Sequence, residues 1–229
     1  MNGDREAILS RIAEALREPA PRHHETMPAP AANNVTAPFR EWLPPVGDSQ
    51  AARVETFAKL SEMLRTEFKR CTTISAAAKH IASLAKAGDW KTLALHRGEL
   101  TDAIAEHLPE SLALLRIEAG YDRDALEASD AGLTECESLV AQTGSACVTA
   151  RSSGGRTLSV LPPHHIIVAR KEQLVADLPA AYELLAQKYD ASYPSFVGFI
   201  TGPSRTGDIE RILVLGAHGP KKLTVLLVP

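Results

Sequence analysis

The stretch CTTISAAAKHIASLAKAGDWKTLALHRGELTDAIAEHLPESLALLRI, residues 71–117, decides the fold class. Three short apolar runs that predict strands alternate here with two segments of helical pattern: 71–75, 76–87, 92–96, 99–107 and 112–117. The first helix is expected to end at Gly88 and the second before Pro109, because glycine favours the left-handed C-cap and proline cannot continue a helix. Strands that alternate with helices in this way indicate a parallel sheet covered by helices.

The flanking sequence adds a helix upstream and a second group of strands downstream. From Gln50 a long helix is expected, with an apolar face made of Val54, Phe57, Leu60, Met63, Leu64 and Phe68. Downstream, the short gaps between four β-rich runs, from residue 137 to residue 170, indicate antiparallel or mixed pairing, and a helix at 172–189 and three apolar strand candidates follow. The predicted strands of this half are 137–142, 145–150, 157–161, 164–170, 195–200, 212–216 and 222–228. The predicted fold class is therefore α/β, an open sheet with flanking helices and mixed parallel and antiparallel strands.

The first 48 residues differ in character from the rest of the chain. A short amphipathic helix places Ile8, Leu9, Ile12 and Leu16 on one stripe. Seven of the fifteen prolines follow between residues 19 and 45, which predicts an extended linker because proline disfavours helix. We therefore expect an N-terminal helix and proline-rich linker at 1–48 and one α/β domain at 49–229.

Charge and composition argue against several classes of function. The net charge is −3, so there is no basic excess that would favour binding to nucleic acid. Cys71, Cys136 and Cys147 are widely spaced and odd in number, which argues against a disulfide framework, a metal site or an iron–sulfur site. No apolar stretch has the length of about twenty residues that a membrane span needs, and the charged N-terminus is unlike a signal peptide. A reduced, cytoplasmic setting is expected.

The richest candidate site is FITGPSRTGDIERILVLGAHGP, residues 199–220. After an apolar strand come residues that together predict an anion cradle made of backbone N–H groups, two hydroxyls and an arginine: Gly202, Pro203, Ser204, Arg205, Thr206, Gly207 and Asp208. The Asp208 carboxylate could orient a substrate hydroxyl or act as a base. The alternative is an ordinary turn in which Thr206 or Asp208 caps a helix.

The same block ends in GAHGP, residues 216–220. A histidine between glycines at a strand end is placed to reach a pocket, so His218 is a candidate for proton transfer and Gly219 for close approach of a ligand. A tight turn with an incidental histidine is the alternative.

Three further groups are weaker candidates. Thr143-Gly144-Ser145 and the turn 152–155 could bind phosphate, but plain hairpin turns explain them as well, and neither standard nucleotide-binding loop is present. His164 and His165 precede an apolar strand, so at most one is expected to face a pocket, and no spacing supports a metal site. Glu135 and Glu137 would share one face of a strand; a solvated face is the expected explanation and a nucleophilic glutamate the alternative.

These motifs resemble a known family. GPSRTGDIERILVLGAHGP, with TLSVLPPHHIIV and AQTGSACV upstream, is similar to the lactate utilization protein C group of the LUD domain family, over residues 51–228. The resemblance implies a fold of the NagB/RpiA/CoA-transferase type and a part in the bacterial oxidation of L-lactate to pyruvate. It also implies partner proteins that carry the iron–sulfur and redox chemistry, so no cofactor is expected here. Ser145 stands where the family tends to have threonine, and a hydroxyl is kept.

Three functional hypotheses follow. In the first, the chain is a subunit of an L-lactate oxidation complex, with Asp208 and His218 catalytic and a small anion held by Thr143, Gly144, Ser145, His164, Gly202, Pro203, Ser204, Arg205, Thr206 and Gly219. In the second, it is a non-catalytic assembly or regulatory module that docks the redox subunits. In the third, it is a stand-alone enzyme that acts on a phosphosugar or CoA ester.

Overall fold

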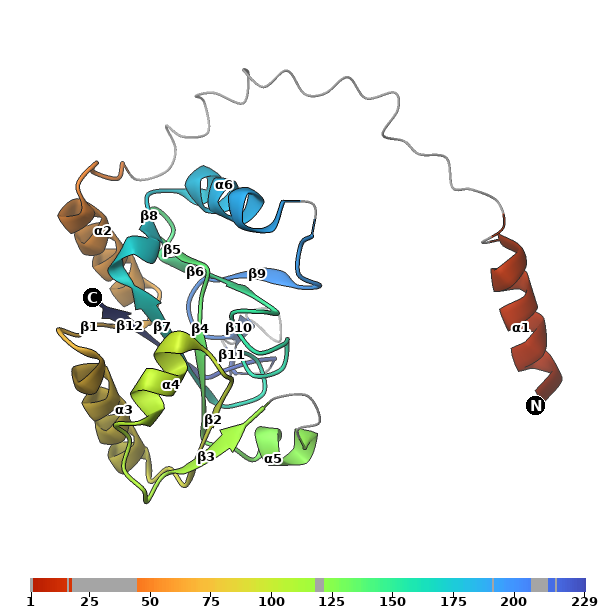
Figure 1. The fold of residues 1–229 in the computed structure, drawn as a ribbon, viewed down its shortest axis with the longest axis horizontal. Coiled ribbons are helices and arrows are strands. Elements are labelled where there is room, and N and C mark those ends of the chain that lie inside the picture. The colour runs from red at the N-terminus through yellow and green to blue at the C-terminus, as the bar shows by residue number, and fades with distance from the viewer. Residues whose placement is uncertain are drawn as a thin grey trace. The chain divides into compact units, whose positions relative to one another are not determined.

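The computed structural model describes residues 2–15, 17, 45–117, 122–190, 192–206, 214–216 and 218–229. It divides into two compact units, Met1–Leu43 and Pro44–Pro229. The first contains the predicted N-terminal helix, α1 (Asn2–Ala15), whose Ile8, Leu9 and Ile12 side chains are exposed (Figure 1). Leu16 and most of the proline-rich segment lie outside the described residues, so the division at residue 48 stays a prediction.

A parallel sheet forms the centre of the second unit (Figure 1). Among the described residues it has six strands, and every neighbouring pair in it is parallel. In spatial order the strands are β1 (Glu67–Arg70), β12 (Lys222–Val228), β7 (His164–Arg170), β4 (Ala131–Glu135), β2 (Thr92–Leu95) and β3 (Ala113–Arg116). This arrangement confirms the open, mainly parallel sheet expected from the strand–helix alternation.

Side chains that alternate along the central strands build two cores on opposite faces of the sheet. Ile166 and Val168 of β7 pack against α3 (Ile74–Gly88) and α4 (Glu99–Ala105). The intervening Ile167 and Ala169 pack into a cluster with α2 (Gln50–Met63) and a second sheet. The period of two along a strand thus buries nearly every residue of β7, which explains its unbroken apolar run.

The second sheet is mixed and carries its own helix. Its strands in spatial order are β8 (Leu174–Val175), β5 (Ser138–Val140), β6 (Ser145–Thr149) and β9 (Val197–Ile200). The β5–β8 pair is parallel, whereas β6 pairs with β5 and β9 in antiparallel fashion. Helix α6 (Leu178–Tyr189) contributes Leu185 and Tyr189 to a small core around Cys147. The mixed pairing predicted for residues 137–142 and 145–150 is confirmed, whereas 164–170 forms β7 and pairs only in parallel in the central sheet.

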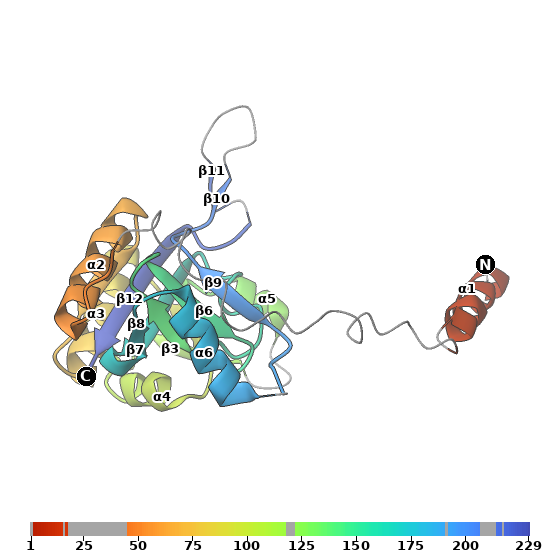
Figure 2. The same ribbon diagram turned by 90° about the horizontal axis from the view of Figure 1, so that it is seen from above.

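Three shorter elements complete the unit. Helix α5 (Arg123–Glu127) precedes β4, and a 3₁₀ turn at Lys171–Gln173 precedes β8. Strands β10 (Arg205–Thr206) and β11 (Val214–Leu215) form an antiparallel pair that extends away from both sheets (Figure 2).

Several predicted elements differ from the structure. Residues 71–75 are no strand, because Thr73 accepts a hydrogen bond from the N–H of Ala76 and caps the start of α3. The strand lies just upstream as β1, so Phe68 belongs to it and the helix that begins at Gln50 ends at Met63, which is exposed. Residues 157–161 form turns rather than a strand, although Leu158 is fully buried. The helix expected from residue 172 begins at Leu178, after the 3₁₀ turn and β8.

Candidate functional site

Backbone hydrogen bonds join three separate segments at the edge where β7 and β12 begin. The N–H of Ser204 donates to the Pro220 carbonyl at 2.9 Å, and the N–H of Gly216 donates to the Ser204 carbonyl at 3.0 Å. The N–H of Lys221 donates to the Pro163 carbonyl at 2.8 Å. The segments before β7, after β9 and before β12 therefore form one rigid rim.

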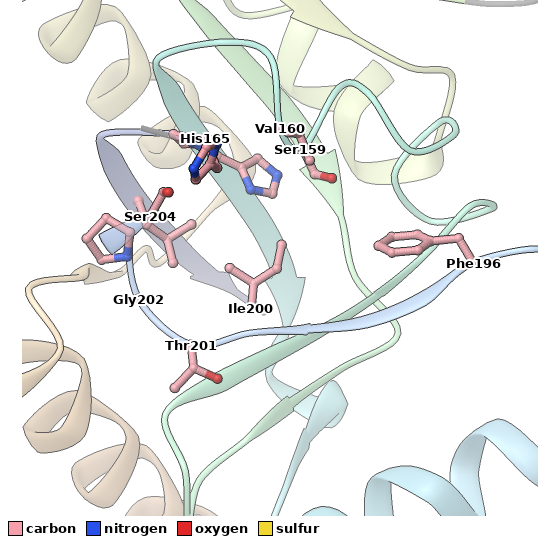
Figure 3. Close-up of a pocket in the computed structure, with 13 residues that line it drawn as sticks. Ser159, Val160, His165, Phe196, Ile200, Thr201, Gly202 and Ser204 are labelled. Atoms are coloured by element: carbon pink, nitrogen blue, oxygen red, sulfur yellow. The ribbon is translucent and has the colours of Figure 1, made fainter. Parts of the chain in front are cut away.

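A pocket of about 210 Å³ lies inside this rim (Figure 3). Its wall is mostly apolar, with a smaller set of polar side chains among the apolar ones. The apolar members are Val160, Phe196, Ile200, Pro203, Pro220 and Leu223, and the polar ones are Ser159, His165, Thr201, Ser204 and His218, with Gly202 and Gly219 completing the wall. An apolar pocket with a few converging polar groups is typical of small-molecule sites.

His165 is the most informative group in this wall. Its side chain is fully buried, and its Nε2 lies 2.8 Å from the Thr134 hydroxyl oxygen. Its Nδ1 has no hydrogen-bond partner. In the tautomer in which the Thr134 O–H donates to Nε2, the proton of the neutral ring lies on Nδ1 and is available as a donor. Burial, with His164 beside it, lowers the pKa of His165 to about 3, so the ring is neutral at pH 7.

Five of the predicted site residues meet in this pocket: Gly202, Pro203, Ser204, His218 and Gly219. Gly202 has a φ of +85°, and a Cβ there would lie 3.0 Å from the backbone oxygen of Leu64. This position therefore needs glycine both for its conformation and for the close approach of the C-terminal end of α2.

The remaining residues of that block lie elsewhere. Arg205 is exposed on β10, although its guanidinium reaches the neighbourhood of Gly202. The backbone of Thr206 pairs with Val214 in the β10–β11 ladder. Asp208, the predicted catalytic carboxylate, lies outside the described residues, and so does Gly207.

The Thr143-Gly144-Ser145 turn does not line the pocket but contacts a residue that does. It joins β5 to β6, and Gly144, with a φ of +65°, packs against Leu60 and Leu64 of α2. The Ser145 hydroxyl lies 2.8 Å from the hydroxyl of Thr201, which does line the pocket. Ser145 thus contacts the pocket wall only through Thr201 within the described part of the chain, and the Thr143 hydroxyl is buried without a partner.

His164 and His165 face opposite sides of β7, so the expectation that at most one faces a pocket is wrong. His164 lines a neighbouring pocket, and its ring is perpendicular to the Trp90 ring with the two centroids 5.1 Å apart. Its Nε2 lies 2.8 Å from the Thr224 hydroxyl. Only His165 joins the pocket of the Gly202 loop, because consecutive strand residues point to opposite faces. The doublet in the sequence carried no signal for which histidine this is.

Glu135 at the end of β4 and Glu137 just beyond it are structural, and the expected solvated face is wrong. Glu135 accepts hydrogen bonds from the backbone N–H groups of Leu100 and Thr101 at 2.7 and 3.2 Å and so caps α4. The Glu137 side chain has no exposed surface. It accepts hydrogen bonds from Thr149, Lys188 and Tyr189 at 2.6–2.7 Å. Burial raises the pKa of Glu137, but these three donors outweigh burial and lower it overall.

The described residues hold no group of three or more histidine, cysteine or acidic side chains that could bind a metal ion. The three cysteines are buried and free. Burial, with Glu137 as a lesser cause, raises the pKa of Cys147 to about 12, so its thiol is not a nucleophile at neutral pH. Within the described helices none has the length and apolar character needed to cross a bilayer.

The family model of the LUD domain matches residues 54–228, about three quarters of the chain. The chain belongs to the LUD domain family. This result confirms the resemblance that the GPSRTGDIERILVLGAHGP block predicted, and the matched range covers both sheets and the pocket between them.

Curated relatives of this LUD domain include several lactate utilization proteins C. The protein from Geobacillus thermodenitrificans is 35% identical over 107 residues, which is 46% of this chain and 45% of that protein. The protein from Deinococcus radiodurans is 34% identical over 125 residues, covering 54% of this chain and 58% of that one. The protein from Bacillus subtilis is 34% identical over 104 residues, with 44% and 43% covered. The matches thus span about half the length of these relatives.

A solved structure supports the fold. The crystal structure of a DUF162 family protein from Deinococcus radiodurans superposes with a TM-score of 0.60 at 24% identity. The match covers 80% of this chain and all of that one. At this identity the similarity establishes the α/β architecture alone.

Proposed function

We propose that this LUD domain serves in bacterial lactate utilization, as a subunit of an L-lactate oxidation complex, and binds lactate or a similar small anion in the pocket beside His165. The names of its relatives support the lactate role. The observation that carries the binding role is the buried His165 Nδ1, which lines an apolar pocket without a partner. A buried donor without a partner costs free energy that a ligand oxygen would recover.

The lining of the pocket matches the parts of lactate. The methyl group would lie against Ile200 and Phe196, while the carboxylate would accept hydrogen bonds from His165 Nδ1–H and the Ser204 hydroxyl. His218 at the rim would accept the hydroxyl proton, and Arg205 would add positive charge from outside. Asp208 remains a proposed catalytic base. Asp208 would take the proton that leaves the lactate Cα, and the two electrons of the oxidation would pass to an iron–sulfur or other redox group on a partner subunit.

A filled pocket tests this proposal. Val160 lines the pocket but is 43% exposed, so Val160→Trp can fill the space from the rim without disturbing the core. Bacterial extract that lacks only this chain is supplemented with purified protein, and lactate-dependent dye reduction is measured. We expect wild type and the control Val160→Ala to restore the activity and Val160→Trp to fail. Full restoration by a folded Val160→Trp protein would exclude this pocket as the site.

A second candidate function is a non-catalytic assembly module. It is favoured by α1, on which Ile8, Leu9 and Ile12 expose 49–58% of their surface, since an isolated helix of this length is marginally stable without a partner. Removal of residues 1–45 would then release the redox subunits while the LUD domain stays folded. Co-purification of the truncated chain with those subunits would reject this role.

A further inference from the structure

A second pocket, of about 240 Å³, lies on the other side of Pro203 and Leu223, which line both pockets. It is located where β1, β7 and β12 begin, and three cationic side chains line it: Arg65, Lys221 and Lys222. Among the described residues none of the three forms an ion pair. The carboxylate in the same wall, Glu67, already binds other partners, His80 at 2.8 Å and the Thr224 hydroxyl at 3.0 Å. The cations therefore leave uncompensated positive charge in a concave site.

Arg65 occupies a backbone conformation that arginine avoids. It follows the C-cap of α2 with a φ of 61°, in the left-handed region, where glycine is the usual residue. An arginine at this position costs stability that glycine would keep. Asp89 adopts a similar φ of 51° at the end of α3, so this conformation is the one in which α2 and α3 end, and it fixes the direction of the chain at Arg65.

Lys221 is likewise held in place by its surroundings. Its aliphatic stem packs against Gly216, where an added Cβ would lie 2.2 Å from the Lys221 Cγ. The backbone N–H groups of Lys221 and Lys222 both point to the Pro163 carbonyl, at 2.8 and 3.2 Å. The backbone at the start of β12 is therefore fixed, which reduces the entropy lost when a ligand is bound.

His164 supplies an acceptor among these cations. The Thr224 hydroxyl donates its proton to the Glu67 carboxylate, so its oxygen accepts from His164 Nε2–H at 2.8 Å. This hydrogen bond leaves a lone pair on Nδ1. Burial, followed by the charge of Lys222, lowers the pKa of His164 to about 4, so the ring is neutral at pH 7. A ligand hydroxyl can therefore donate to it.

We infer that this second pocket binds a phosphate-class dianion that carries a hydroxyl, either hydrogen phosphate itself or a small hydroxylated phosphomonoester. Three cations exceed what one carboxylate group needs, whereas a phosphate offers three or more acceptor oxygens and a double charge. The acceptor at His164 selects for the hydroxyl. The inference is independent of lactate, because the pocket beside His165 takes no part in it.

The test uses titration calorimetry on the full chain at pH 8 and low salt, with inorganic phosphate, glycerol 3-phosphate and sulfate as probes. We expect saturable binding of at least one phosphate probe, and weaker binding of sulfate, which has no hydroxyl. Tighter binding of glycerol 3-phosphate would assign the site to an organic phosphate, and equal or tighter binding of inorganic phosphate to the free ion. Absence of binding by both phosphate probes would overturn the inference, and sulfate binding as tight as phosphate would overturn the contact with His164.

Matched variants locate the site. Lys221→Ala/Lys222→Ala is expected to weaken phosphate binding by tenfold or more, on the order of fivefold for each exposed cation removed. Lys79→Ala removes an equivalent exposed charge from α3 and should bind as wild type does. Arg65→Gly should weaken binding while the Tm stays equal or rises, because the backbone strain is relieved. A double lysine variant that binds phosphate like wild type would overturn the assignment.

Discussion

Glu135, the last residue of β4, and Glu137 just beyond it are bound by backbone and side-chain donors, whereas at the amino ends of β7 and β12 the side chains of His164 and His165 face pockets. The carboxyl ends are where ligands usually bind in open α/β sheets, because neighbouring connections diverge there. In this LUD domain, His96 Nε2 accepts the Glu135 backbone N–H at 3.3 Å and Gly154 lies against the His96 side chain. The 150–155 loop therefore occupies the usual ligand position.

In the described part of this domain the two candidate pockets lie beside polar groups that lack partners, and not at the usual ligand position. At the carboxyl ends, Glu135 has two backbone donors and Glu137 has three side-chain donors. At the amino ends, by contrast, His165 Nδ1 and three cations have no partner among the described residues. The first region stabilises the fold, and the second is free to bind ligands.

The largest expected effect concerns pH and the two histidines of the amino ends. Both have folded pKa values, about 4 for His164 and about 3 for His165, below the ordinary 6.5. The unfolded chain therefore binds more protons than the folded chain below pH 6.5, and stability is lost as pH falls from 6.5 toward 4. The loss should reach about 3 kcal/mol for each histidine. The free energy of unfolding, measured by urea denaturation at a series of pH values in this range, should fall steeply with falling pH. In His165→Asn this dependence on pH should be weaker. An unchanged dependence would contradict the burial of a neutral His165 ring.

The next effect concerns the satisfied network behind the carboxyl ends. Glu137→Leu removes the acceptor of Thr149, Lys188 and Tyr189 and should lower the free energy of unfolding by about 3 kcal/mol. Glu137→Gln keeps one acceptor oxygen and should cost less. Urea denaturation of both variants measures this, and a folded Glu137→Leu protein of wild-type stability would show that the network is dispensable.

Glu135→Ala should have a smaller effect of the same kind, about 1–2 kcal/mol, because two backbone N–H groups of α4 lose their cap. Because Glu135 lies away from the proposed lactate pocket, we expect this variant to support lactate-dependent dye reduction as wild type does at temperatures below its Tm. A loss of activity in the folded variant would place function at the carboxyl ends and reverse the comparison.

The smallest expected energy, about 1.4 kcal/mol or tenfold in lactate affinity, comes from the His165 donor itself. His165→Asn and His165→Leu both lose the imidazole contact with Thr134, but only asparagine keeps an N–H near the position of Nδ1. Calorimetric titration with L-lactate should therefore separate the two variants about tenfold. Equal lactate affinity in the two folded variants would show that the N–H group at this position does not contact lactate.

The periodicity of apolar residues predicted those strands and helices that are long enough for the repeat to be visible. The helix of α3, the strands β2 and β3 and the apolar run of β7 were all predicted within a few residues. Residues 71–75 misled because threonines favour strands and helix caps alike, and only the N–H of Ala76 on Thr73 distinguishes the two. Residues 157–161 misled because an apolar run can also be a buried loop, as Leu158 shows.

The 202–220 block predicted the family, and the alternation of strand and helix patterns predicted the α/β class, because both signals lie in residues that are neighbours along the chain. Which polar groups have partners could be seen only once the strands were placed in three dimensions. His164 and His165 are adjacent in sequence, yet Thr224 meets one and Thr134 the other, on opposite faces of β7. Hydrogen-bond satisfaction depends on residues tens of positions apart, so it is settled only when the strands take their places in the sheet.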